Sequence, residues 1–239
     1  AGLGGLPLVA YGALAGSGSG LPIAMASLWV AAVGIVISQT VWFPLLRGYV
    51  QMMRNPHFMM LALASGIPFN GMFLYVLSAP VWLGEILQLQ PTQFFWFFCM
   101  SVSGIMLGAW LSGRLAGRIK PKHQIRHGFV IMLGTSLVNV LMNLLSTPHP
   151  FWAMLTVSIF SFGWALMVPV VTLMVLDLVP ERRGMASSVQ AFIGSMANGL
   201  VAGVIAPLVM HSAQALALTS LGMLGIGVGA WIWVKPRVT

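Results

Sequence analysis

The chain has 239 residues and a formal net charge of +8 at pH 7, with 59% hydrophobic but only 6% charged residues. Because an average soluble domain has roughly 25% charged residues, this composition excludes a protein whose whole surface faces water. Several uncharged runs exceed the roughly 20 apolar residues that a helix needs to cross a bilayer. A helix satisfies all of its own backbone groups in lipid, so the sequence predicts an all-α, polytopic membrane helix bundle.

Loop signals divide the chain into helices and short connections. Residues 1–20 are rich in Gly and Ala and indicate no definite structure, while residues 21–46 hold one candidate span and the start of a linker. We expect residues 47–239 to form a six-helix bundle that one or two helices precede. In chain order, the expected spans are 21–43, 55–79, 94–111, 129–145, 151–176, 185–210 and 215–234.

The basic residues alternate with the predicted spans. The connections around Glu85, Pro148 and His211 contain no Lys or Arg, so six helices bring every basic group to one face of the membrane. By the positive-inside rule, this face and the C-terminus should be cytoplasmic. The four basic groups are Arg47 and Arg54; Arg114, Arg118, Lys120, Lys122 and Arg126; Arg182 and Arg183; and Lys235 and Arg237.

This topology accounts for the positive charge, so we expect no nucleic-acid binding. The 114–126 cluster is either a solvated loop that sets the topology or a contact for anionic lipid headgroups.

The single cysteine, Cys99, is interpreted as a small buried side chain, and the histidines lie near helix ends without carboxylates that could join them as metal ligands. No acid or nucleophile–base pair lies near a predicted membrane midplane. We therefore expect no metal site, no cofactor and no enzymatic activity.

Amides are the main polar groups inside the predicted spans. Asn70 shares a helical face with Gly66 and Phe73, and Gln190 shares one with Asn198 at i and i+8. An unpaired amide in hydrocarbon is costly, so these faces should point into the bundle or into a wet cavity. Hydrogen bonding between helices is the alternative explanation for each amide.

For Asn139 and Asn143, hydrogen bonding between helices is the preferred interpretation. Small residues at i and i+4 also predict close helix packing. The Gly-x-x-x-Gly pairs are Gly104 and Gly108, Gly113 and Gly117, Gly199 and Gly203, and Gly225 and Gly229.

Three stretches resemble parts of major facilitator superfamily transporters. "DLVPERRGMASSVQ" (177–190) is similar to the loop between the tenth and eleventh helices of that superfamily. "GAWLSGRLAGRIKPK" (108–122) resembles its Gly/Arg-rich cytoplasmic loop motif, with Ser112 where the motif often has Asp. "PLLRGYVQMMRNPHFMMLALASGIPFNGMFLYVLSAP" (44–80) resembles the beginning of the seventh helix in the Bcr/CflA group of drug:proton antiporters. The resemblance covers residues 44–239 and implies the C-terminal six-helix half of such a transporter.

The resemblance implies proton-driven efflux of small amphipathic or cationic compounds across a bacterial inner membrane. Its partners would be substrate, protons, lipids and, if the chain is a fragment, the N-terminal half of the transporter. Because the present chain has no acid near a predicted midplane, we expect the proton-coupling carboxylates in that N-terminal half. Efflux of a sugar or metabolite and a non-transporting half are the alternatives. The residues expected to line the central cavity are Phe69, Asn70, Phe73, Trp164, Gln190 and Asn198. The residues expected at a cytoplasmic gate, or acting only in topology, are Asp177, Glu181, Arg182, Arg183, Arg114 and Arg118.

Overall fold

The computed structural model describes Ala26 and residues 29–33, 43–145 and 149–234. The chain separates into two compact units, residues 1–51 and 52–239, and each is considered by itself. The described residues of the first unit are helical and include most of α3 (Phe43–Arg54). Segment 1–20 and most of the span expected at 21–43 lie outside the described residues.

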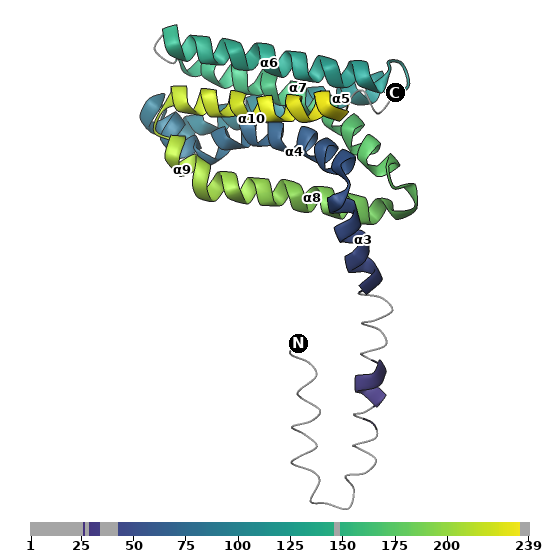
Figure 1. Ribbon diagram of the computed structural model, residues 1–239. Helices are drawn as coiled ribbons and strands as arrows, with labels where there is room; N and C mark the ends of the chain where they lie inside the picture. The colour runs from purple at the N-terminus through teal and green to yellow at the C-terminus, as the bar shows by residue number, and fades with distance from the viewer. Residues whose placement is uncertain (1–25, 27–28, 34–42, 146–148, 235–239) are drawn as a thin grey trace, which may run out of the picture. The chain divides into compact units, whose positions relative to one another are not determined.

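The second unit is a bundle of membrane-length helices, and no strand forms among the described residues (Figure 1). Six segments are long and apolar enough to cross a bilayer, which confirms the predicted all-α, polytopic architecture. Short one- or two-turn elements, η2 (Pro80–Ile86), η3 (Pro91–Gln93) and η4 (Pro180–Arg182), lie in the connections. The helices are α4 (Pro56–Leu77), α5 (Phe94–Leu115), α6 (Pro121–Leu145), α7 (Pro150–Asp177), α8 (Arg183–Leu200), which continues through η5 (Val201–Ile205) into α9 (Ala206–Val209), and α10 (Ala213–Val234).

Proline marks the start of several helices because its missing N–H would be unpaired there in any case. At α4 the preceding Asn55 also caps the helix, since its Oδ1 accepts hydrogen bonds from the backbone N–H groups of His57 at 3.0 Å and Phe58 at 3.4 Å. Pro121 begins α6 in the same way, which corrects the long connection expected at 112–128. Only residues 116–120 separate α5 from α6, so several basic residues assigned to a loop lie on helical turns.

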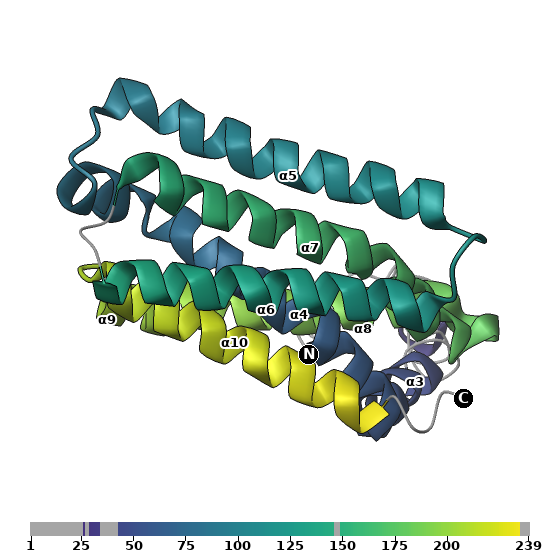
Figure 2. The same ribbon diagram turned by 90° about the horizontal axis from the view of Figure 1, so that it is seen from above.

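Helix α7 is the centre of the packing, because it contacts α4, α5, α6 and α8. Helix α5 lies along α7 at one edge of the bundle (Figure 2), and α8 lies against α4 on the side away from α10 (Figure 1). Where α4 meets α10, the absence of a side chain at Gly227 leaves room for the Pro68 ring, since a Cβ there would lie 2.4 Å from the Pro68 Cγ.

The predicted Gly-x-x-x-Gly contacts form at one pair. A Cβ on Gly104 would lie 2.3 Å from the carbonyl oxygen of Ser158, and one on Gly108 would lie 2.4 Å from that of Phe162, so these two glycines let α5 approach α7 closely. A Cβ at any glycine of the other three pairs would meet nothing within 4 Å beyond its own helix backbone, within the part of the chain that the structure describes.

Successive helices run in opposite directions, so α4, α6 and α8 run one way along the bundle while α5, α7 and α10 run the other way (Figures 1 and 2). The end of the bundle where α4, α6 and α8 begin carries Arg54, the α5–α6 basic residues and the Asp177–Arg183 segment, and we name it the basic end. Glu85 lies at the opposite end, in η2. This arrangement places the amides expected to line a cavity at mid-depth in α4 and α8.

Candidate functional site

A polar cluster forms where α4, α7 and α8 meet. The Gln190 side-chain nitrogen Nε2 donates to Ser65 Oγ at 3.1 Å and lies 3.3 Å from Thr172 Oγ1, so one amide on α8 contacts hydroxyls on two other helices. The hydroxyl of Ser65 donates in turn to the Ala62 carbonyl at 3.0 Å. Three helices are thereby joined by hydrogen bonds between uncharged groups.

Aromatic rings surround this polar cluster. The indole Nε1 of Trp164 donates to the Ser65 carbonyl at 3.0 Å, which fixes the Trp164 ring beside α4. The ring of Phe69 lies 4.9 Å from that of Trp164 and 5.5 Å from that of Phe73, with the two phenyl rings nearly parallel. All three rings are half-buried, so each keeps part of its surface accessible.

Asn70 and Asn198 add two hydrogen-bond acceptors to the site. Asn70 is 1% exposed and donates its Nδ2 to the Gly66 carbonyl at 3.1 Å, a bond that directs its Oδ1 away from its own helix. Neither the Oδ1 of Asn70 nor that of Asn198 has a partner among the described residues, although both atoms are buried. Buried unpaired polar atoms are rare in folded proteins, and a bound water, ion or ligand is one explanation for them.

The register of α4 and α8 places these two amides at the same level. A Cβ on Gly66 would lie 3.8 Å from the Cα of Gly194, so the two helices pass close together there. Asn70 follows Gly66 by four residues, and Asn198 follows Gly194 by four residues. Because both helices begin at the basic end, one turn further along each places Asn70 and Asn198 on neighbouring faces.

The structure therefore brings Phe69, Phe73, Trp164 and Gln190 into one network, with Asn70 and Asn198 beside it. We name this group, together with Ser65 and Thr172, the α4–α7–α8 site. Sequence reasoning missed the two hydroxyls. Ser and Thr are common in membrane helices, where they often bond to their own backbone, so nothing in the sequence distinguishes these two from others.

The residues expected at the gate lie in exposed positions at the basic end. Arg183 and Asp177 form an ion pair at 2.8 Å, with side chains that are 59% and 63% exposed respectively. Because Asp177 ends α7 and Arg183 begins α8, the pair closes the connection between those two helices. Glu181 and Arg182 are exposed within η4.

At the neighbouring α5–α6 connection, Arg114 lies over the Trp110 ring, 4.6 Å from its centroid, while Arg118 is exposed. Below this surface, the Gln124 Nε2 donates to Ser112 Oγ at 2.7 Å and to the Leu166 carbonyl at 2.9 Å. Helices α5, α6 and α7 are thus joined at the basic end by a buried, uncharged group of side chains. Ser112 contributes a hydroxyl to it at the position where the resembling motif often has a carboxylate.

Metal-ligand residues do not gather in the described part of the chain, where no group of three His, Cys, Asp or Glu side chains lies close enough to hold an ion. The arrangement instead combines apolar spans, a polar and aromatic site between three helices, and an exposed ion pair in a connection at the end of the bundle. Such an arrangement suits the passage or binding of a molecule within a membrane.

The comparison with protein families decides the identity. The family model described as Major Facilitator Superfamily matches residues 36–203, well over half of the chain. The chain belongs to the major facilitator superfamily. A search of curated proteins found no match. As a member of this superfamily, the chain is an integral membrane protein of a membrane-transport family, and its helices α4–α10 form a polytopic major facilitator bundle.

Proposed function

We propose that this chain takes part in the export of small amphipathic cations in exchange for protons, as the C-terminal half of a transporter resembling the Bcr/CflA group. The observation that supports this most directly is the α4–α7–α8 site, where half-buried aromatic rings lie beside two buried amide oxygens without partners. These groups suit a cargo that is largely apolar and carries a hydrogen-bond donor or positive charge.

The chemistry of the site favours a cation over an anion. The faces of Trp and Phe rings attract cations, by about 0.5–1 kcal/mol at exposed positions and about 2 kcal/mol when desolvated. Amide oxygens accept hydrogen bonds from ammonium or hydroxyl groups but repel anionic oxygens. Asn70 Nδ2 donates to the Gly66 carbonyl, whereas the buried Oδ1 has no partner among the described residues, so the oxygen is the group of Asn70 that most needs a ligand.

A sugar would fit the same site less well. Each sugar hydroxyl that leaves water needs its own partner, and a buried hydroxyl without one costs several kcal/mol. Within the described site, Gln190 already donates to Ser65 and Thr172, and Trp164 already donates to the Ser65 carbonyl. The buried atoms of the site that have no partner among the described residues are the amide oxygens of Asn70 and Asn198, and they lie beside aromatic rings, which suits an amphipathic molecule with few polar groups.

Proton coupling would require a group that changes its charge within the membrane. Among the described residues, the acids are Glu85 in η2, Asp177 at the last residue of α7 and Glu181 in η4, so none lies at mid-depth in a span. We infer that the coupling carboxylates belong to the N-terminal half of the transporter. By the positive-inside rule, the basic end and the C-terminus would face the cytoplasm of a bacterial inner membrane.

The experiment is an ethidium accumulation assay in bacteria that lack their own drug exporters and express the transporter containing this chain. Asn70→Ala and Phe73→Ala should each raise accumulation toward the level of cells without the transporter, because each removes a group from the site. Asn143→Ala is the matched control, since it removes a half-buried amide of α6 outside the site. With equal amounts of protein in the membrane, export by both site variants at the wild-type rate would refute the assignment. Absence of export by the wild type would favour the non-transporting alternative.

A further inference from the structure

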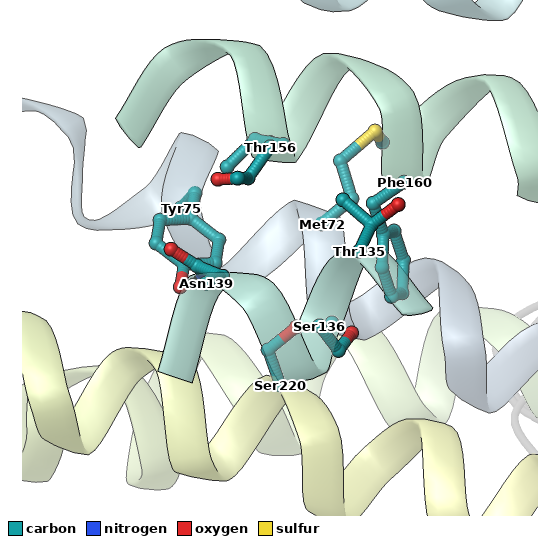
Figure 3. A pocket seen from close by; sticks show the side chains of 10 residues that line it. Met72, Tyr75, Thr135, Ser136, Asn139, Thr156, Phe160 and Ser220 are labelled. Atoms are coloured by element: carbon teal, nitrogen blue, oxygen red, sulfur yellow. Dashed lines mark hydrogen bonds between the residues drawn. The ribbon is translucent and has the colours of Figure 1, made fainter. Parts of the chain in front are cut away.

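A polar cavity lies inside the bundle between α4, α6, α7 and α10 (Figure 3), and none of its lining residues belongs to the α4–α7–α8 site. It leaves about 10 Å³ for the centre of a water-sized sphere, which is roughly what one water molecule needs. Its lining carries oxygen atoms from four helices. The polar side chains that line it are Tyr75, Thr135, Ser136, Asn139, Thr156 and Ser220.

One hydroxyl in this lining has no partner. The Oγ of Ser136 is buried and forms no hydrogen bond with the described residues, and the Ser136 side chain is 4% exposed. A buried hydroxyl left unpaired costs about 1–3 kcal/mol. Because Ser136 lines the cavity, a small polar molecule bound there could form a hydrogen bond with its hydroxyl and remove this cost.

Neighbouring groups offer the further bonds that a bound water requires. Asn139 donates its Nδ2 to the Tyr75 hydroxyl oxygen at 2.7 Å, so the Tyr75 proton can itself be donated to another molecule. Thr135 and Thr156 donate to carbonyls of their own helices, at 2.7 Å to Ile131 and 2.9 Å to Ala153, which leaves their oxygens able to accept. A buried water typically forms about three hydrogen bonds and can donate and accept at once, as this mixture of groups demands.

The lining selects water over a cation. The cavity is lined by hydroxyl, amide and apolar groups, and none of its lining residues is a carboxylate. A bare cation at this depth would lack any compensating negative charge and would lose its hydration, which is far more costly than burying one neutral water.

We propose that this cavity is a binding site for a single water molecule, which links Ser136 of α6 to the hydroxyls of the adjoining helices. The water forms the hydrogen bond that the Ser136 hydroxyl lacks and accepts a hydrogen bond from the Tyr75 hydroxyl, so it extends the Tyr75–Asn139 bond into a network across the bundle.

Radiolytic hydroxyl-radical labelling of the purified chain in lipid nanodiscs tests this proposal, because radicals formed from a bound water modify the side chains next to it. Met72 lines the cavity and is 5% exposed, whereas Met132 and Met167 are 0% exposed and lie outside its lining. Met72 should therefore be oxidised several-fold faster than either of the other two methionines. Equal rates in the wild-type protein would overturn the proposal.

A pair of substitutions tests whether Met72 is labelled faster only because it is slightly more exposed than Met132 and Met167. Ser136→Val fills the cavity with methyl groups and removes the unpaired hydroxyl, so the rate at Met72 should fall to that of Met132. Ser101→Val is the matched control, because Ser101 is 4% exposed and also carries an unpaired buried hydroxyl, but lies on α5 away from the cavity. It should leave Met72 labelling unchanged. Undiminished labelling of Met72 in folded Ser136→Val would contradict the proposal even if the wild-type rates differ.

Discussion

The close crossing of α5 and α7 makes Gly104→Ala a sharp test of the packing. The added Cβ would lie 2.3 Å from the Ser158 carbonyl oxygen and 3.0 Å from its Oγ. A backbone oxygen cannot rotate away, so the two helices must separate by about 1 Å to restore an ordinary contact. That separation also stretches the hydrogen bond that the Ser158 hydroxyl donates to the Met100 carbonyl across the same crossing.

The size of the effect follows from two opposing contributions. Overpacking of a well-packed interface costs about 1–3 kcal/mol, whereas replacing Gly by Ala within a helix gains up to about 1 kcal/mol from helix propensity. Gly113→Ala has the same propensity gain on the same helix, but its Cβ meets nothing within 4 Å beyond the helix backbone in the described chain. The difference between the two variants therefore isolates the crossing and should be about 1–3 kcal/mol.

The measurement is reversible unfolding of the purified chain in mixed micelles, followed by circular dichroism as denaturing detergent is added. Gly104→Ala should unfold at a lower detergent fraction than the wild type, and Gly113→Ala should unfold at the same fraction or a higher one. Equal stability of the two variants would refute the close approach of α5 and α7 at Gly104.

Three further predictions concern the charged and polar groups at the basic end and the coupling. Asp177→Asn should lower the free energy of unfolding by less than about 1 kcal/mol, because the ion pair is exposed. In a double-mutant cycle, the exchanged pair Asp177→Arg with Arg183→Asp should be at least as stable as the wild type. The exchange puts a positive charge at the C-terminus of α7 and a negative charge at the N-terminus of α8, and each helix dipole favours that sign. Additive losses in that cycle would contradict the pairing. Gln124→Ala should cost about 1–3 kcal/mol in the same unfolding assay by leaving Ser112 and the Leu166 carbonyl without this partner, and an unchanged midpoint would count against that network. The purified chain in liposomes should insert but should not take up drug in response to a proton gradient; uptake that is lost in Asp177→Asn would refute the coupling argument.

The sequence predicts the spans well because the exclusion of charge from hydrocarbon is a strong physical constraint. It predicts their boundaries less well. The α5–α6 connection is only residues 116–120, since basic residues such as Lys122 and Arg126 occupy helical turns at the end of a span without cost. Cys99 was expected to be buried and is instead exposed on α5, because a mid-helix position does not reveal which face points outward.

Small-residue spacing was a similarly incomplete guide to packing. Gly104 and Gly108 lie at a helix crossing, but Gly225 and Gly229 have the same spacing and meet no neighbouring side chain or backbone in the described structure. Spacing shows that two residues share a face, whereas the tertiary fold decides whether another helix lies there. Asn139 and Asn143 were both expected to bond between helices. The hydrogen bond from Asn139 to Tyr75 of α4 confirms this for Asn139, whereas Asn143 Nδ2 donates to Asn139 of its own helix.

Within the candidate site, helical periodicity was enough to place Asn70 and Phe73 on one side of α4 and Gln190 on a polar face of α8. It could not show that these faces meet, nor that Ser65 is the acceptor that joins them. Contacts between helices depend on packing and register, which a single sequence does not specify.

The most direct test of the central claim is equilibrium binding of radiolabelled tetraphenylphosphonium, an amphipathic cation, to the purified chain in lipid nanodiscs. The account predicts saturable binding that Asn70→Ala and Trp164→Ala each weaken substantially, because one removes the partial negative charge of an amide oxygen and the other an aromatic face. Asn143→Ala should leave the affinity unchanged. Binding that does not saturate, or that is equally strong in all three variants, would contradict the claim that the α4–α7–α8 site recognises cationic substrates.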